Sequence, residues 1–338
     1  MVNVAFLAIR TPHRLLDNTL RVGANILYRA GASSDRIRLR LVADQPVRPL
    51  TRAIRARLPM ALRDRWSVHS TRDAPAWAAL LHRKLCARGC QGPVCDVYML
   101  KPLLHLFLPL SLDRVIFLDS DVYLFSDITL LWQRFNDLFA PAQLMALAPE
   151  ENDFSSQRDV VARGGISVNG GVEMLHLARM RDPAFGYTEL LWRYARRDPL
   201  LPLNGERGLG IQGEQVLYSW MSIKGSPGHA MVGRLPCSWN MQVASWPSHV
   251  SREDADSPRR RCVTARNATK RASNRTSCHL LHGAGGEAKS LMARLLRDPS
   301  GRSCASAFNQ ARKSSRHYPP GSPSEALFLR VRHACCAS

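Results

Sequence analysis

One apolar run that ends in two carboxylates constrains the fold of this chain more than any other stretch. Residues Val115–Leu118 are all β-branched or bulky, which predicts a buried strand. Asp119 and Asp121 follow at once, and the two-residue period of a strand would place both side chains on one side if the strand continued. Such a pair suits a divalent ion, because Mg2+ and Mn2+ take carboxylate oxygens and leave room for substrate phosphates. The alternative, which the short motif alone favours, is a solvated strand end with turn-forming Asp and Ser.

The composition allows a large core and leaves the meaning of the charge open. The chain has 338 residues, 45% of them hydrophobic, and a formal net charge of +20. That length fits one large domain or two. The charge fits a polyanion partner (nucleic acid, a sulfated glycan or an acidic membrane face) or a general preference for Arg. Because the basic residues are spread and no compact run resembles a nucleic-acid-binding motif, we expect no nucleic-acid partner.

The N-terminus and the cysteines bear on the compartment. No stretch approaches the length of a membrane-spanning helix, and residues 2–9 lack the length and basic flank of a signal peptide. The nine cysteines include no Cys-x-x-Cys pair, so a zinc ribbon is not expected. Two Asn-x-Thr sequons, at Asn267 and Asn274, lie between Cys262 and Cys278, which favours an oxidising, glycosylating lumen. A lumenal protein would then lack its anchor or signal in this chain, and a cytoplasmic protein with reduced thiols is the alternative.

The N-terminal stretch predicts a strand–helix–strand unit. Residues 2–9 are apolar, residues 36–44 alternate basic and apolar before becoming apolar, and a helical pattern lies between them. This unit implies an α/β fold with a parallel sheet, in which nucleotides bind at the carboxyl ends of the strands. The segment Ala8-Ile9-Arg10 lies at the first of these ends, and Asp44 lies at the second.

A helix is predicted over residues 98–108, just before the Asp119 strand. Its apolar residues recur at helical spacing, and Lys101 lies off that stripe. The amine of Lys101 would reach a phosphate bound near Asp119. The alternative, which the pattern alone favours, is a solvated helix lysine.

Two further segments carry candidate sugar-binding groups. Two glycines after Asn169, at Gly170 and Gly171, indicate either a close approach of backbone to another group or a plain Asn-Gly turn. Glu214 and Gln215 begin a predicted helix, where they would face a ligand or, in the case of Glu214, simply favour the helix dipole.

The last third of the domain offers a histidine and a lysine. Residues 208–213 match G-x-G-x-x-G, but no strand precedes them, so a dinucleotide fingerprint is rejected. His282 lies at a predicted strand end and is a candidate third metal ligand, although a lone His is more often structural. Lys289 follows a Gly-rich turn and is a candidate phosphate contact.

In this order, the segments resemble the family 8 retaining glycosyltransferases over roughly residues 2–296. The likeness is greatest to the xylosyltransferase-like members, namely the glucoside xylosyltransferases and the xylosyl domain of the dystroglycan-modifying enzymes. Each motif is weak alone, whereas the set in this order is specific. The segments that carry it are Leu100–Pro102, Val115–Asp121, Asp127-Ile128 before Leu131-Trp132, Ala146–Glu150, Asn169–Val172, Gly213–Gln215, Leu235–Asn240 and Leu281–Gly283.

The resemblance implies a GT-A fold, that is, one α/β Rossmann-like domain over residues 1–296 with a mixed, mainly parallel central sheet flanked by helices. Residues 251–277 would be an Arg-rich insertion loop, and residues 297–338 a basic, Ser/Pro-rich tail of loose order. The implied cofactor is Mn2+ or Mg2+, with a UDP-sugar as donor substrate and a glycan or glycoprotein as acceptor. The implied location is the Golgi or endoplasmic reticulum lumen, with no membrane segment in this chain.

The same resemblance assigns roles to individual residues. The metal ligands would be Asp119, Asp121 and His282. Gln215, Glu214 and Asn169 would form the catalytic set near the anomeric carbon and the sugar. The donor-binding set would be Ala8, Ile9, Arg10, Asp44, Lys101, Ser120, Gly170, Gly171, Gly283 and Lys289.

Three positions depart from the family pattern. The family usually has Asp where this chain has Glu214, which is one methylene longer. It usually has Ser or Thr where this chain has Gly170. Its last motif often reads His-x-x-x-x-Lys-Pro, whereas Lys289 lies further from His282 and no Pro follows.

The sequence therefore predicts a retaining, Mn2+-dependent UDP-sugar transferase, with xylose favoured over glucose, galactose or glucuronate. A polyanion-binding protein on a transferase scaffold and a folded but inactive relative are the alternatives. Steep weakening of binding by salt would identify the first, and the departures at Glu214 and Gly170 would suit the second.

Overall fold

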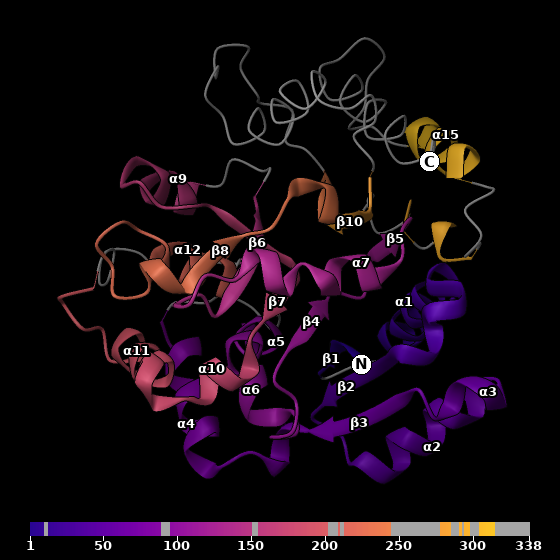
Figure 1. The fold of residues 1–338 in the computed structure, drawn as a ribbon, viewed down its shortest axis with the longest axis horizontal. Helices are drawn as coiled ribbons and strands as arrows, with labels where there is room; N and C mark the ends of the chain where they lie inside the picture. Colours follow the sequence, from indigo (N-terminus) through magenta and orange to yellow (C-terminus); the bar gives the residue numbers. More distant parts are fainter. Residues whose placement is uncertain are drawn as a thin grey trace.

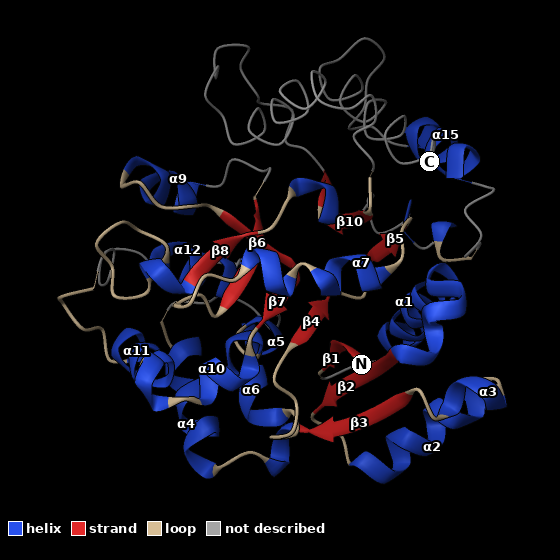
Figure 2. Ribbon diagram, viewed as in Figure 1, coloured by secondary structure: helices blue, strands red, loops and turns tan. Residues whose placement is uncertain are grey.

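The computed structural model describes residues 1–9, 13–88, 95–150, 155–201, 209, 213–244, 278–284, 291–292, 294–297 and 304–314. Arg10, Lys289 and the predicted insertion loop 251–277 lie outside these residues. Figure 1 follows the chain through the fold, and Figure 2 shows the strands in the middle of the molecule with helices on both sides.

A seven-stranded sheet forms the centre, in the order β3-β2-β1-β4-β7-β6-β8. Strand β7 runs antiparallel to both of its neighbours, and the other described pairs in this sheet are parallel. The predicted α/β class with a mixed, mainly parallel sheet is therefore confirmed. The strands are β1 (Val2–Ala8), β2 (Ile37–Ala43), β3 (Trp66–Ser70), β4 (Val115–Leu118), β6 (Met145–Pro149), β7 (Val168–Leu175) and β8 (Val232–Arg234).

Both faces of this sheet are buried, which explains its apolar strands. In β1, Val4 and Phe6 belong to one core cluster, and Ala5 and Leu7 belong to the other. Because side chains alternate along a strand, each cluster lies on its own face. Helices α1 (His13–Ala30), α2 (Val47–Arg57), α7 (Ile128–Gln133) and α15 (Cys304–Ser314) contribute to the first cluster. Helices α4 (Ala76–Cys86), α6 (Leu104–Phe107), α10 (Leu177–Arg181), α11 (Tyr187–Ala195) and α12 (Glu214–Met221) contribute to the second.

A second, three-stranded sheet lies beyond the end of β4. Its order is β5 (Val122–Leu124), β10 (Leu280–Ala284) and β9 (Met241–Ala244). Strand β10 pairs antiparallel with β5, so that His282 lies opposite Val122. This pairing brings a residue from far along the chain next to the segment that follows β4. The remaining described α-helices are α3 (Met60–Arg63), α5 (Cys95–Tyr98), α8 (Phe135–Leu138) and α9 (Ser155–Ala162).

Two predicted elements differ from the structure. Residues 98–108 do not form one helix: α5 ends at Tyr98, a 3-10 turn η3 spans Lys101–Leu103, and α6 follows. Pro102 lacks an N–H and restricts the residue before it, which interrupts a regular helix here. Asn169-Gly170-Gly171 lies inside strand β7, so the Asn-Gly turn is wrong.

The segment predicted to be a loose tail contains a packed helix. Helix α15 spans Cys304–Ser314, and its Cys304, Ala307 and Phe308 are buried in the first core cluster. The expectation of loose order is therefore wrong for this part of 297–338. None of the helices in the described part of the chain combines the length and the apolar character that crossing a membrane requires.

Candidate functional site

The two carboxylates of the organising motif lie in a turn between the two sheets. Strand β4 ends at Leu118, and β5 begins at Val122. The Asp119 N–H donates to the carbonyl of Gly171 at 3.0 Å, and the Gly283 N–H donates to the carbonyl of Asp121 at 2.8 Å. These backbone bonds fix the turn against β7 on one side and β10 on the other.

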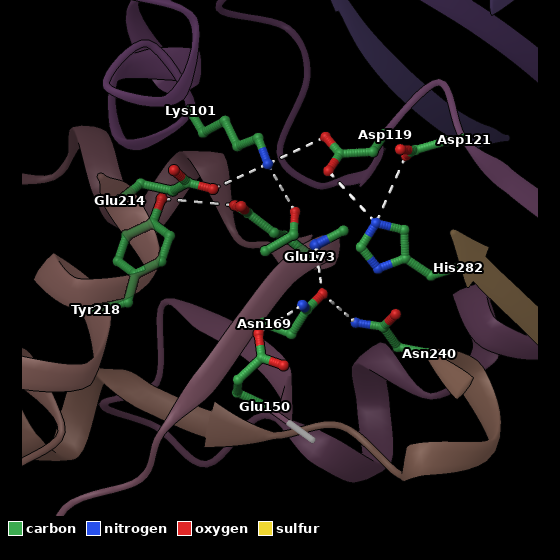
Figure 3. A network of polar contacts seen from close by, with 12 residues as sticks. Lys101, Asp119, Asp121, Glu150, Asn169, Glu173, Glu214, Tyr218, Asn240 and His282 are labelled. Atoms are coloured by element: carbon green, nitrogen blue, oxygen red, sulfur yellow. Dashed lines mark hydrogen bonds and ion pairs between the residues drawn. The ribbon is translucent and has the colours of Figure 1, made fainter. Parts of the chain in front are cut away.

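His282 faces both carboxylates, as the sequence predicted for a three-residue metal group. Its Nε2 lies 3.5 Å from Asp121 Oδ1 and 3.8 Å from Asp119 Oδ2, and one ligand atom of each residue lies within 4.8 Å of the others (Figure 3). Burial would lower the pKa of His282, but the hydrogen bond and charge of Asp121, together with Asp119, raise it above its usual value. Two carboxylates and an imidazole are donors that Mn2+ and related divalent ions accept. The residues present therefore fit a divalent metal ion.

Gly171 is required for His282 to occupy this place. A Cβ at residue 171 would lie 2.2 Å from His282 Cε1 and 2.3 Å from Nδ1. The predicted close approach of the glycine backbone to another group is therefore found, and that group is the imidazole.

Lys101 is buried at the centre of the site and is not the solvated lysine that its helix pattern favoured. Its Nζ lies 2.9 Å from Glu214 Oε1 and 3.0 Å from Asp119 Oδ1, and it donates to the carbonyl of Gly170 at 2.8 Å (Figure 3). Burial would lower the pKa of Lys101, but Asp119, Glu214 and Glu173 hold it well above its usual value. Lys101 therefore stays charged and joins β4, β7 and α12.

Glu214 fills the space that Gly170 leaves. Helix α12 begins at Glu214, after Gly213 with φ 49°, and the Glu214 side chain is completely buried. A Cβ at residue 170 would lie only 2.5 Å from Glu214 Oε1. The two departures from the family pattern therefore meet at one place. The carboxylate of the longer acid, Glu214, lies where a side chain at residue 170 would begin.

Burial gives Glu214 an unusual ionisation. It raises the pKa of Glu214 to about 7, and the attraction of Lys101 opposes this shift. A carboxyl with such a pKa changes charge near neutral pH.

Glu173 is a buried carboxyl that sequence reasoning missed. It lies in β7 with no exposed surface, and Tyr218 Oη donates to its Oε2 at 3.5 Å (Figure 3). Its Oε1 has no hydrogen-bond partner among the described residues and would lie 3.1 Å from a Cβ at Gly170. Burial raises the pKa of Glu173 well above its usual value, against the attraction of Lys101. The available signal was one charged residue inside the apolar run Val172–Leu175.

Asn169 is bound on both sides of its amide by the protein itself. Its Oδ1 accepts from the Gly171 N–H and from Asn240 Nδ2, each at 2.9 Å, and its Nδ2 donates to Glu150 Oε2 at 2.9 Å. In this structure Asn169 therefore holds β7 in place, and its contact with a sugar stays a prediction. The buried acceptors Gln215 Oε1 and Asn240 Oδ1 have no hydrogen-bond partner among the described residues.

Four other residues predicted to contact the donor lie at the carboxyl ends of strands in the main sheet. Ala8 ends β1 and Ile9 follows it, and Asp44 follows β2. Parallel pairing of Ala5 with Phe117 places the end of β1 beside the end of β4, where Ser120 lies between the two aspartates. Gly283 follows His282 in β10. The nucleotide-binding roles of these residues, and of Arg10 and Lys289 outside the described residues, stay predictions.

The fold with this site is that of the GT-A glycosyltransferases. Mouse xyloside xylosyltransferase 1, solved in its apo form, superposes with a TM-score of 0.59 at 18% identity, over 83% of this chain and 97% of that one. The galactosyltransferase LgtC, solved with donor and acceptor sugar analogues, gives a TM-score of 0.56 at 14% identity, over 98% and 100% of the two chains. At these identities the likeness concerns the fold.

Among curated proteins, part of the chain is similar to the LARGE xylosyl- and glucuronyltransferases. Human LARGE2 is 34% identical over 152 residues, which cover 43% of this chain and 19% of LARGE2. Human LARGE1 is 29% identical over 152 residues, covering 43% of this chain and 18% of LARGE1. The match thus spans about a fifth of these relatives. None of the protein-family models matches the chain.

Proposed function

We propose that this protein is a retaining glycosyltransferase that moves a sugar, xylose in preference, from a UDP-sugar to a hydroxyl of a glycan or glycoprotein. One observation carries the proposal: Asp119, Asp121 and His282 converge beside a buried lysine where β4 ends. The preference for xylose rests on the similarity to xylosyl- and glucuronyltransferases and to a xyloside xylosyltransferase, and not on the geometry of the site.

The metal part of the proposal assigns Mn2+ to Asp119, Asp121 and His282. When bound, the ion would supply positive charge to balance the diphosphate of the donor. Lys101 contributes a second, permanent cation a few ångströms away, since Asp119 contacts it at 3.0 Å. The site thus offers positive charge where a leaving nucleotide diphosphate gathers negative charge.

The catalytic part of the proposal rests on the start of helix α12. Glycosyl transfer gives the anomeric carbon oxocarbenium character. The unpartnered amide oxygen of Gln215 would face this carbon and stabilise its developing charge. Glu214, held by Lys101, would orient hydroxyls of the donor. For configuration to be retained, the acceptor hydroxyl attacks from the face that UDP leaves.

The lumenal location is a further part of the proposal. Cys237, Cys278 and Cys304 are disulfide-bonded. Disulfides persist in oxidising compartments such as the secretory lumen. Together with the sequons at Asn267 and Asn274, this supports the Golgi or endoplasmic reticulum lumen.

A donor screen tests the proposal. The purified protein is incubated with UDP-xylose, UDP-glucose, UDP-galactose and UDP-glucuronate, with Mn2+ or with EDTA, and released UDP is measured. We expect release that needs Mn2+ and is fastest with UDP-xylose. Direct UDP binding with and without Mn2+ provides a second measurement. Absence of both release and Mn2+-dependent UDP binding would refute the transferase assignment.

A further inference from the structure

A second group of metal-ligating side chains lies away from the glycosyltransferase site. His82 and Cys86 are four residues apart on helix α4, and Asp96 lies on α5. Residues at this spacing share one face of a helix. All three side chains are half-buried, and one donor atom from each lies within 4.8 Å of the others. Nothing in the proposed transfer reaction uses them.

The two distances from the sulfur atom in this cluster are close to those between ligands of a small tetrahedral ion. Cys86 Sγ lies 3.6 Å from His82 Nε2 and 3.8 Å from Asp96 Oδ1. Zn2+ binds sulfur at about 2.3 Å and nitrogen or oxygen at about 2.0–2.2 Å, so tetrahedral ligands lie about 3.4–3.6 Å apart. Cys86 Sγ thus lies close to the spacing that zinc ligands need from both His82 Nε2 and Asp96 Oδ1.

The chemistry of the three donors selects the ion. A thiolate with an imidazole suits Zn2+, whereas Mn2+ prefers oxygen ligands. The Asp119, Asp121 and His282 group contains no sulfur, so the two groups would take different ions. In the structure Cys86 Sγ donates to Asp96 Oδ1, and His82 Nε2 donates to the Asp96 carbonyl at 2.9 Å. Binding would release the thiol proton and exchange these bonds for metal bonds.

We propose that His82, Cys86 and Asp96 bind a zinc ion that joins the end of helix α4 to helix α5. The polypeptide continues from α5 into η3, which carries Lys101, so the ion would anchor the segment that leads into the transferase site. The proposal does not depend on the transferase activity. It assigns a structural role to the ion, because its ligands come from two helices outside the catalytic network.

Cobalt spectroscopy on the full chain tests this proposal. Co2+ takes the place of Zn2+, and a cysteine ligand then gives a thiolate-to-cobalt charge-transfer band in the near ultraviolet. We expect the band in the wild-type protein, its loss in Cys86→Ser and at least tenfold weaker Co2+ binding in His82→Asn. Asp121→Asn is the matched control, because it disables the other metal group and should keep the band. Excess Zn2+ should remove the band, and it should raise the melting temperature of Asp121→Asn but not of the double variant Asp121→Asn with Cys86→Ser.

Two results would overturn the zinc site. One is a missing band, or a band of full strength in Cys86→Ser. The other is a disulfide at Cys86 in the purified protein, found by alkylation and mass spectrometry; Cys90 and Cys95 are its neighbours in the sequence. If Cys86→Ser does not fold, protection of Cys86 from alkylation by Zn2+ in the wild-type protein decides the question, and unchanged alkylation refutes it.

Discussion

The two halves of the candidate site differ in their access to solvent. At the metal half, the side chains of Asp119 and Asp121 are 25% and 17% exposed. At the lysine half, the side chains of Lys101 and Glu214 are 2% and 0% exposed. The metal half can therefore receive a ligand, whereas the lysine half is a buried set of charges held against the backbone of β7 by the Lys101–Gly170 hydrogen bond. Changes in the first half should mainly affect ligand binding and turnover, and changes in the second should also affect stability.

The largest effect on turnover is expected from Asp121→Asn. The change removes one anionic ligand from the partly exposed half, and we expect Mn2+-dependent UDP release to fall at least about 100-fold. The melting temperature should change by only a degree or two, because Lys101 and Glu214 are untouched. Full turnover of this variant at limiting Mn2+ would show that Asp121 is not a metal ligand.

Lys101→Met should show the largest effect on stability. It removes the cation that pairs with Glu214 and Asp119, and breaking a buried ion pair costs about 3–5 kcal/mol. Urea unfolding measures the loss. In the matched double variant, Lys101→Met with Glu214→Leu, part of this stability should return because the unpaired buried carboxylate is gone. Equal stability of Lys101→Met and wild type would show that the lysine half is not a coupled network.

The close approach of Glu214 to Gly170 predicts an intermediate effect on stability and turnover when residue 170 gains a side chain. Gly170→Ser places a Cβ at 2.5 Å from Glu214 Oε1, and we expect a loss of about 1–3 kcal/mol in stability, with reduced turnover. The double variant Gly170→Ser with Glu214→Asp shortens the acid by one methylene and should recover most of both. Additive losses in the double variant would show that the two residues do not compensate each other.

The ionisation of Glu214 predicts a pH dependence of stability. Its pKa is about 7 in the folded protein, whereas the ordinary pKa of a glutamate is 4.5. The folded state therefore holds the proton more tightly, so this contribution is complete below pH 4.5 and is lost as pH rises through 7. It amounts to at most about 3 kcal/mol. Urea unfolding in EDTA, from pH 4.5 to 8, should show wild type losing stability relative to Glu214→Gln; parallel curves would contradict the shift.

The sequence was informative about the metal half because its signals are local. A buried strand that ends in two aspartates is visible in the seven residues Val115–Asp121, and only His282 had to be added from elsewhere. The order of motifs then predicted the fold class and the mixed sheet. The burial of Lys101 could not be seen in the same way, because its acceptor on Gly170 is 69 residues distant. A helical pattern around Lys101 depends only on residues near it in the sequence. It carries no information about β7, the strand whose Gly170 carbonyl accepts from Lys101.

Glu173 was missed for a related reason. A single acid in an apolar strand belongs to no recognisable motif. The role of Glu173 depends on its contact with Tyr218 and its charge interaction with Lys101, which lie on other elements. The packing of helix α15 was also beyond reach, since the basic and polar composition of its segment gave no sign of a buried face. Site residues were thus predictable where polar side chains directly follow a buried strand in the sequence. They were not predictable where charged side chains from different helices and strands come together only in the folded protein.

Strands β9 and β10 run side by side in the same direction, and this sets a lower limit on the chain between them. A tight hairpin reverses direction, whereas neighbouring parallel strands need a crossover of about a dozen residues or more. A connection shorter than this could not join the end of β9 at Ala244 to the start of β10 at Leu280. An engineer can shorten this connection, but trimming it to a turn would force β10 to run backwards and withdraw His282 from Asp119 and Asp121.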